Sequence, residues 1–325
     1  MKQHITRAYN SFSINGDLGT ITKMSKEPRL KDEINYYEEI SKVDNKCSIF
    51  FPRLLSYSSR SEGYSMELEY YAYNNLGDYM VYGEFDRDFW EVVAEALDRA
   101  MNQFLKTHQP INTVPHTTAM YINKTERYYW DLVNNFDKFR SLAGAESLVI
   151  NGERCLNFES LWGRVKEIIR NKLLVADGFS IIHGDFCFSN ILCGINKKTN
   201  TAVLKFVDPR GNFGVNGIFG DPAYDSAKLL HSYEGGYEYI IYDQFDVEEN
   251  SAESRYSIKF SNDNKDKIAD IFSQRTYFRS IESKLIEGLI YIGMCSRHYD
   301  STKRQTAMYL TGVKILNEVL KGETR

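Results

Sequence analysis

The run FSIIHGDFCFSNILCGINKKTNTAVLKFVDPRG, residues 179–211, restricts the possible folds of this chain more than any other segment. A short apolar stretch opens the run and is typical of a buried strand. Asp185 follows this stretch, and Asn190 lies five positions further on. Two β-rich stretches then flank a polar turn, and the second of them ends at Asp208. The pattern predicts a strand, a loop and a hairpin that carry an Asp, an Asn and a second Asp to one site.

These residue types suit the transfer of a phosphoryl group. The transition state of that reaction is loose, so a protein mainly positions the reacting groups and balances their charge. A carboxylate beside the acceptor hydroxyl orients the hydroxyl and takes its proton, and we assign this role to Asp185. Carboxylate and amide oxygens are hard ligands for Mg²⁺, so Asn190 and Asp208 are predicted to hold magnesium on the nucleotide phosphates. An Asp or Asn near a turn more often binds the local backbone, but the ordered set favours a site.

Length and charge set broad limits. The chain has 325 residues, enough for two lobes or one large domain, and its net charge of −4 gives no general attraction to nucleic acid or anionic membranes. No apolar run approaches the length of a membrane span, and the first residues, MKQHITRAYN, lack the apolar core of a signal peptide. Five scattered cysteines without a Cys-x-x-Cys pair indicate neither a zinc site nor a disulfide framework. We therefore expect a cytoplasmic protein without nucleic-acid or membrane partners, of unspecified oligomeric state.

The first 71 residues predict a small antiparallel sheet with one helix. SFSI and GTITKMS favour strands, and the intervening Asn15-Gly16-Asp17 is a tight-turn signal. Apolar residues recur at helical spacing over 29–40. Residues 48–57 and 63–71 have the composition of two further strands.

Residues 72–325 predict a larger, mainly helical part. One helix is expected to run to Phe104, with Asp88 and Glu91 as a capping box at its start. Further helices are expected over 118–139, 156–174, 268–274, 280–294 and 301–320, and a hairpin or excursion over 234–264.

Two segments resemble one family. HGDFCFSN, residues 183–190, is similar to the HGD-x-x-x-x-N catalytic loop of the aminoglycoside phosphotransferase and choline kinase group, which are small-molecule kinases. GDPAYDSAKLLHS, residues 220–232, is similar to the GDP-x-YD-x-A segment of the same group. The resemblance implies an α+β, bilobal protein-kinase-like fold, with a nucleotide-binding lobe over 1–71 and a catalytic and substrate-binding lobe over 72–325. VDPRG and the following Gly-rich stretch also resemble phosphotransferase-like proteins from bacterial capsule and surface-polysaccharide loci.

The resemblance implies the roles already assigned to the two Asp residues and the Asn, and it adds others. Asp221 is expected to brace the catalytic loop, and Asp225 to cap or pack the next helix. His183 is expected to be structural. Arg210 either neutralises the transferred phosphate or pairs with a carboxylate of the fold, and we favour the pair. The activation segment and Ala-Pro-Glu of protein kinases are missing, which favours a small acceptor.

The nucleotide contacts follow from the same resemblance. Lys23 is the candidate for the lysine on the α- and β-phosphates, and Glu33 for its ion-pair partner. The chain departs from the family here, because only NGDLG, and no GxGxxG, precedes the lysine. Asn15, Gly16 and Gly19 either present backbone N–H groups to the phosphates or form a plain hairpin turn.

The adenine is expected at the connection between the lobes, near Glu69, Tyr70 and Tyr71. We therefore expect an enzyme that uses ATP and Mg²⁺ to phosphorylate a hydroxyl of a sugar, polyol or amino alcohol, with surface-polysaccharide assembly as the narrower expectation.

Two alternatives stay open. An antibiotic phosphotransferase would need an acidic cleft for its polycationic substrate, although a charge run is usually a solvated face. The acidic candidates are Glu234, Glu238, Asp243, Asp246, Glu248 and Glu249. The other alternative is a catalytically silent nucleotide-binding protein, against which the set of two Asp and one Asn argues. Choline recognition would need an aromatic cage, but Tyr128, Tyr129 and Trp130 cannot share one helix face, so we expect them in the core.

Overall fold

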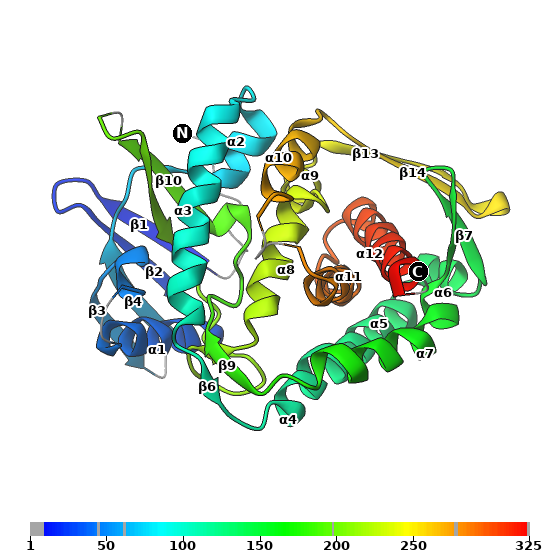
Figure 1. Ribbon diagram of the computed structural model, residues 1–325, viewed down its shortest axis with the longest axis horizontal. Coiled ribbons are helices and arrows are strands. Elements are labelled where there is room, and N and C mark those ends of the chain that lie inside the picture. The colour runs from blue at the N-terminus through cyan, green and yellow to red at the C-terminus, as the bar shows by residue number, and fades with distance from the viewer. Residues whose placement is uncertain (1–9, 44–45, 61–62, 197, 276–278, 324–325) are drawn as a thin grey trace.

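The computed structural model describes residues 10–43, 46–60, 63–196, 198–275 and 279–323. They form two lobes, one built on a small sheet and a larger one built mainly of helices (Figure 1). Apart from Asn10, the N-terminal segment MKQHITRAYN lies outside the described residues. None of the helices formed by the described residues combines the length and the apolar character needed to cross a bilayer.

The sheet lobe is a four-stranded antiparallel sheet with strand order β1-β2-β4-β3 and one helix. Its elements are β1 (Asn10–Asn15), β2 (Thr20–Ser25), α1 (Arg29–Lys42), β3 (Leu54–Arg60) and β4 (Gly63–Glu69). The predicted strand over 48–57 begins later than expected. Ser48–Phe50 form a short 3-10 turn, and Pro52, which has no N–H for a strand ladder, precedes β3.

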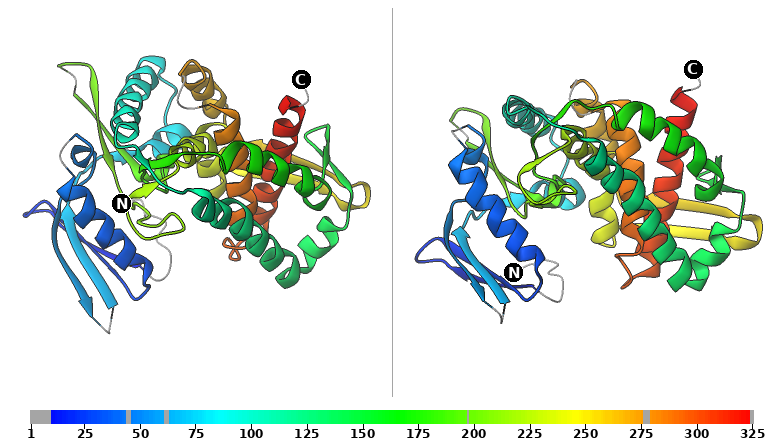
Figure 2. Two further views of the ribbon diagram at one scale, coloured as in Figure 1. Left: turned by 60° about the horizontal axis from the view of Figure 1, so that its bottom comes forward. Right: turned by 90° about the horizontal axis from the view of Figure 1, so that it is seen from below.

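Helix α1 lies on the face of the sheet that is turned toward the larger lobe (Figure 2). The four apolar positions predicted from its spacing are all buried: Leu30, Ile34, Tyr37 and Ile40. Tyr36 is also buried, and its hydroxyl donates to the carbonyl of Ile182 at 3.0 Å. Through this bond α1 holds the sheet against the segment that carries Asp185.

The predicted strand, loop and hairpin are confirmed. They consist of β9 (Gly178–Ile181), the 3-10 turn η4 (Phe188–Asn190), β10 (Ile191–Asn196) and β11 (Thr201–Phe206). β9 lies between β6 (Gln109–Pro110) and β12 (Phe219–Gly220), and β10 lies between β11 and β5 (Asn74–Asn75). All four residues of β9 are buried, as its apolar sequence predicts.

The helical lobe packs around α8 and α11. Its helices are α2 (Leu76–Tyr82), α3 (Arg87–Leu105), α4 (Val114–Thr117), α5 (Lys124–Asn135), α6 (Asp137–Ala143), α7 (Phe158–Ile168), α8 (Pro222–Tyr233), α9 (Tyr237–Ile241), α10 (Asn264–Phe272), α11 (Ile281–Cys295) and α12 (Thr302–Glu323). π-helical turns over Thr118–Asn123 and Ile169–Leu173 precede α5 and follow α7. α11 packs against α5, α8 and α12, so the centre of the core lies among these helices.

A second small sheet closes the far end of this lobe. It comprises β7 (Ser147–Ile150), β8 (Glu153–Leu156), β13 (Phe245–Asn250) and β14 (Arg255–Phe260), in the order β13-β14-β7-β8. The hairpin expected within 234–264 is therefore present as β13 and β14, joined by a 3-10 turn at Ser251–Glu253.

Three local predictions were wrong. The N-cap of α3 is Asp86, whose carboxylate accepts from the N–H of Phe89, so Asp88 lies inside the first turn and the predicted capping box is absent. The helix expected over 118–139 breaks at Phe136, which is extended. Tyr129 is buried as expected, but Trp130 is 48% exposed and lies outside the core.

Candidate active site

The segment with Asp185 is a tight turn that only glycine can form. Gly184 has φ +77°, a left-handed conformation, and a Cβ there would lie 2.8 Å from the Cβ of Arg210. The N–H of Arg210 in turn donates to the carbonyl of His183 at 2.8 Å. The loop before Asp185 and the segment after Asp208 are thus in direct contact.

His183 connects the same two segments through its ring. The ring is buried, the backbone N–H of Asp185 donates to Nδ1 at 3.2 Å, and Nε2 donates to the carbonyl of Val207 at 2.9 Å. Burial lowers the pKa of His183 to about 4, so the ring is neutral and serves as a fixed spacer. This is the structural role expected from the sequence.

Asp185 lies between two cations. Its carboxylate is 3.0 Å from the ammonium of Lys228 and 3.6 Å from the guanidinium of Arg29. Burial favours the neutral carboxyl, but Lys228 and Arg29 outweigh it and hold the pKa of Asp185 well below its usual range. Asp185 is therefore a weak base that can orient a hydroxyl, which suffices where the transition state is loose and the proton leaves late.

Asn190 and Asp208 lie together beside this loop. The side-chain N–H of Asn190 donates to the backbone carbonyl of Asp185 at 2.8 Å, and the N–H of Val207 donates to the carbonyl of Asn190 at 3.0 Å. Because its amide nitrogen is engaged, Asn190 presents its oxygen as a possible ligand. Asp208 adopts a left-handed conformation, φ +58°, that is uncommon outside glycine.

The donor set fits a magnesium ion. A carboxylate and an amide oxygen are ligands that Mg²⁺ accepts, and this ion normally completes its coordination with phosphates and water. Within the described residues no cluster of three or more His, Cys, Asp or Glu could hold a metal alone. A site at Asn190 and Asp208 would depend on a bound nucleotide, as the sequence hypothesis requires.

Lys23 and Glu33 form the ion pair expected from the sequence. The two buried side chains meet at 2.7 Å, and Lys23 lies equally close, 2.7 Å, to Asp208. Burial opposes the charge of Lys23, but Glu33 and Asp208 outweigh it and raise the pKa of the lysine. Burial raises the pKa of Glu33 to about 7. Although burial works against ionisation, Lys23 keeps the pKa of Asp208 below its usual value.

The turn that precedes Lys23 is a closed hairpin turn. The side-chain oxygen of Asn15 accepts from the N–H groups of Asp17 and Leu18, at 3.2 and 3.1 Å, and Gly19 has φ +61°. The turn therefore uses two of its own N–H groups. A phosphate contact of Asn15, Gly16 or Gly19 stays a prediction.

The connection between the lobes is held by its own side chains. Glu69 accepts from the guanidinium of Arg53 at 2.6 Å and from the hydroxyl of Tyr71 at 3.1 Å. The N–H of Tyr70 donates to the carbonyl of Gly19 at 2.8 Å. These contacts place the connection beside the hairpin turn, and adenine binding there stays a prediction.

The expected roles of Asp221 and Asp225 are exchanged. Asp225 is buried and its two carboxylate oxygens accept from the N–H groups of His183, at 2.6 Å, and Gly184, at 2.8 Å, so it braces the loop that carries Asp185. Asp221 caps α8 by accepting from the N–H of Ala223 at 2.9 Å. The predictions were wrong because both residues lie in one short motif, and the motif does not show where α8 begins. Only the start of the helix decides which of them faces the loop.

Arg210 does not form the ion pair that the sequence favoured. Its guanidinium donates to the hydroxyl of Tyr224 at 3.0 Å, and no carboxylate of the described residues lies within ion-pair distance of it. Gly211, next in VDPRG, has φ +65°, and a Cβ at this position would collide with the carbonyl oxygen of Asp32 in α1. The motif thus packs directly against the sheet lobe.

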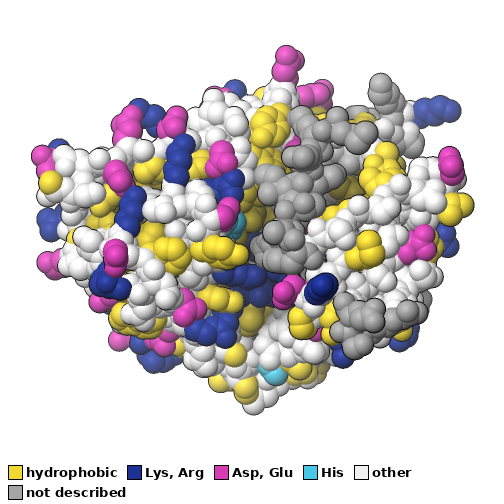
Figure 3. Space-filling view, turned by 180° about the vertical axis from the view of Figure 1, so that it is seen from behind, with side chains coloured by type: hydrophobic (Ala, Val, Ile, Leu, Met, Phe, Trp, Pro, Cys, Tyr) yellow, Lys and Arg dark blue, Asp and Glu magenta, His cyan; other side chains and the backbone are white. Residues whose placement is uncertain are grey.

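The sequence reasoning missed the basic surroundings of Asp185. A cavity beside this residue is lined by five cationic side chains: Arg29, Lys124, Arg210, Lys228 and Arg297. Figure 3 shows Lys and Arg side chains gathered in the hollow near the middle of this face. Lys228 lies within GDPAYDSAKLLHS, one turn after Asp225, and could have been found there. Nothing in the sequence indicates that Lys124 and Arg297 meet.

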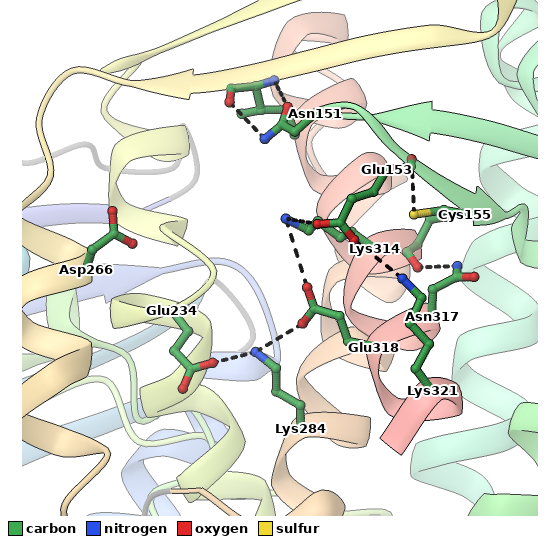
Figure 4. Close-up of polar contacts among 12 residues, drawn as sticks. Asn151, Glu153, Cys155, Glu234, Asp266, Lys284, Lys314, Asn317, Glu318 and Lys321 are labelled. Atoms are coloured by element: carbon green, nitrogen blue, oxygen red, sulfur yellow. Dashed lines mark hydrogen bonds and ion pairs between the residues drawn. The ribbon is translucent and has the colours of Figure 1, made fainter. Parts of the chain in front are cut away.

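The six acidic residues proposed for an acidic cleft do not form one. Glu238 is fully buried and accepts from Ser189 and Ser232. Glu234 pairs with Lys284 at 2.6 Å (Figure 4). The remaining four pair with separate cations, as Asp243–Arg304, Asp246–Lys303, Glu248–Lys259 and Glu249–Lys138.

Comparisons with known proteins bear on the fold. No protein-family model and no curated protein matches the chain. A solved structure of a mutant aminoglycoside 2′-phosphotransferase IIIa in complex with GDP matches with a TM-score of 0.54 and 13% identity, over 98% of this chain and 94% of that one. A structure of an aminoglycoside 3′-phosphotransferase of type VIII matches with a TM-score of 0.39 and 13% identity, over 91% and 84%, which is too weak to support an argument. The first match confirms the bilobal, protein-kinase-like fold.

Proposed function

We propose that this chain is a small-molecule kinase that transfers the γ-phosphoryl group of ATP to a hydroxyl group. One observation carries the proposal: Asp185, Asn190 and Asp208 are held by one hydrogen-bonded backbone, and the Lys23–Glu33 pair reaches Asp208. A structural turn would need neither the buried lysine nor the left-handed Asp208.

Each residue then has a defined task. Asp185 accepts a hydrogen bond from the acceptor hydroxyl, aims its oxygen at the γ-phosphorus and receives the proton as the new P–O bond forms. Lys23 leaves Asp208 in part to contact the α- and β-phosphates, and Glu33 keeps its ammonium in place. Asn190 and Asp208 would hold Mg²⁺, which neutralises charge on the phosphates.

The acceptor is a small molecule. We propose a sugar, polyol or amino alcohol, and a role in cytoplasmic steps of surface-polysaccharide assembly as the narrower possibility. The matched 2′-phosphotransferase is a GDP complex, so GTP is tested beside ATP. An aminoglycoside is disfavoured, because the acidic residues that would bind a polycation are buried or paired elsewhere.

Two measurements test the proposal. Thermal unfolding with ATP or GTP, with and without Mg²⁺, should show stabilisation that depends on the metal, because a ligand of the native state raises its apparent stability. A panel of sugars, polyols, amino alcohols and aminoglycosides should then give acceptor-dependent release of nucleoside diphosphate. Stabilisation without any turnover would favour the silent nucleotide-binding protein, and absence of both would end the proposal.

A further inference from the structure

The cavity beside Asp185 carries a large excess of positive charge. Five cationic side chains line it against a single carboxylate, that of Asp185, among the described lining residues. That carboxylate is already shared by Lys228 and Arg29. From outside the lining, Asp225 and Glu238 also act on Lys228, and Asp208 acts on Arg29. The imbalance is therefore greatest around the remaining cations, where mutual repulsion raises the energy of the folded state.

Lys124 shows the imbalance most clearly. No carboxylate of the described residues forms an ion pair with it, and its ammonium lies 5.8 Å from the centroid of the Tyr224 ring. Burial, followed by Arg210, Arg297 and Lys228, lowers the pKa of Lys124 well below its usual value. An anion bound in the cavity would remove this repulsion.

This cavity is separate from the nucleotide end of the site. Lys23, Asn190 and Asp208 do not line it, and Lys23 is already balanced by Glu33 and Asp208. Lys124 begins α5 and Arg297 follows α11, so both belong to the helical lobe. The excess charge therefore lies on the acceptor side of Asp185, where a γ-phosphate held by Lys23 and magnesium would not neutralise it.

The size and remaining walls of the cavity fit a small anionic group. The cavity measures about 60 Å³, roughly the space needed by four or five water molecules. Its other walls are apolar side chains of α11, such as Leu289 and Ile290, and the tyrosines Tyr121, Tyr224 and Tyr237. The hydroxyl of Tyr121 already donates to Asp221 at 2.6 Å, whereas that of Tyr224 accepts from Arg210 and can still donate to an oxyanion. The apolar wall suits a carbon skeleton.

We propose that this cavity binds an oxyanion of the acceptor, so that the acceptor is a hydroxyl compound that already carries a phosphate or a carboxylate. This inference rests on the proposed function and names the substrate class of the same site. The anionic group sits among Lys124, Arg210 and Arg297, and the hydroxyl reaches Asp185.

Binding of simple anions tests the cavity directly. The protein is saturated with Mg²⁺ and a non-hydrolysable ATP analogue, which fills the γ-phosphate position, and its thermal unfolding is followed with inorganic phosphate, acetate or chloride at matched ionic strength. We expect phosphate or acetate to stabilise the protein beyond chloride. Lys124→Met should lose that stabilisation, and Arg297→Gln serves as a second variant in case the first folds poorly. Lys314→Met, a lysine outside this cavity, should keep it.

Matched acceptors test the substrate class. Glucose, glucose 6-phosphate and glucuronate are compared, as are glycerol, glycerol 3-phosphate and glycerate, with kanamycin as a polycation. We expect at least one anionic member to have a KM about tenfold or more below that of its neutral parent, as expected for a charge-assisted hydrogen bond. Lys124→Met should raise the KM of that anion to the level of the parent.

The outcomes separate this inference from the proposed function. Equal stabilisation by all three anions, retention of the phosphate effect in both Lys124→Met and Arg297→Gln, or preference for neutral or polycationic acceptors would overturn the inference and leave a kinase. If the ATP analogue and Mg²⁺ give no stabilisation, the proposed function fails. The anion measurements still report on the cavity in that case.

Discussion

Two cavities, both lined in part by residues of α11, differ in their charge. The first cavity, beside Asp185, has five cations against one carboxylate, whereas the second is lined by four of each: Lys265, Arg279, Lys284 and Lys314 against Glu234, Asp266, Asp270 and Glu318. The second cavity is also larger, about 440 Å³.

The charges of the second cavity neutralise one another. Lys284 contacts Glu234 at 2.6 Å and Glu318 at 4.0 Å (Figure 4). It also contacts Glu287 at 3.1 Å, and Lys265 contacts Asp266 at 2.6 Å. A ligand there would have to replace existing pairs, whereas a ligand of the first cavity would supply a missing charge. Uncompensated charge therefore marks the candidate acceptor site better than volume does.

The largest expected effect is on kcat, when a carboxylate of the first cavity is removed and compared with one of the second. Asp185→Asn should lower kcat by about 10²–10⁴-fold, because the amide cannot take the proton of the acceptor. Stabilisation by magnesium and nucleotide should be retained, since Asp185 does not face the nucleotide end. Glu318→Gln, in the second cavity, should leave kcat unchanged. Acceptor-dependent release of nucleoside diphosphate measures kcat, and thermal unfolding measures nucleotide binding. Undiminished turnover in Asp185→Asn would refute its role.

The next effect concerns stability and the second cavity. Lys284→Met should lower the free energy of unfolding by about 3–5 kcal/mol, because it leaves the fully buried Glu287 without its cation. Lys321→Met removes an exposed pair with Glu153 and should cost about 1 kcal/mol or less. Urea unfolding measures the difference. Comparable losses in the two variants would show that the second cavity is not held by its ion pairs.

A smaller effect on stability is expected at Asp225, which braces the loop beside the first cavity. Asp225→Asn places an amide group against the N–H of His183 or Gly184, and we expect a loss of about 1–3 kcal/mol in stability with a reduced kcat and an unchanged nucleotide affinity. Asp221→Asn should keep the cap of α8 and lose about 1 kcal/mol or less. If kcat falls in Asp221→Asn and not in Asp225→Asn, the support of the loop by Asp225 does not matter for turnover, and Asp221 has the role expected from the sequence.

The smallest effect concerns His231, a buried residue near the end of α8. His231 is buried between Tyr237 and Tyr291, with ring centroids 4.3 and 4.2 Å away. Burial and Lys228 lower the pKa of His231 well below its usual value, against an opposing contribution from Asp185. The unfolded chain therefore binds a proton below about pH 6.5 that the folded ring does not, and stability falls as the pH falls, by at most about 1.4 kcal/mol per pH unit.

His231→Phe should remove this part of the pH dependence. The free energy of unfolding, measured by urea at pH 7 and at pH 5.5, should differ less in the variant than in the parent protein. An equally steep dependence in both would show that His231 is not the group that titrates.

The sequence predicts those features that depend on neighbouring residues. The hairpin of β1 and β2, the apolar face of α1 and the loop and hairpin around Asp185 all follow from local turn signals and periodicity. The short α2 has no such signal and was missed. The hairpin of β7 and β8 was also missed, although Asn151-Gly152, both with positive φ, is a tight-turn signal of the same kind. Ion pairing between Lys23 and Glu33 could be expected only because the family resemblance supplied it.

The basic cavity could not be predicted, for a physical reason. Arg29, Lys124 and Arg297 lie far apart in the chain and meet only through the packing of α1, α5 and α11 around Asp185. The predicted roles of Asp221 and Asp225 were wrong for the opposite reason. They are so close in sequence that only the first turn of α8 decides which one faces the loop.

Arg29 and Lys23 each form an ion pair between the sheet lobe and the rest of the site, so both pairs depend on the position of the sheet. Both residues belong to the sheet lobe, and their partners, Asp185 and Asp208, belong to the other side of the site. A movement of the sheet away from the helical lobe would separate Arg29 from Asp185 and Lys23 from Asp208 together. Under the proposed function, a ligand at one end that favours the closed arrangement would raise the affinity for a ligand at the other end by an equal factor, as reciprocity requires.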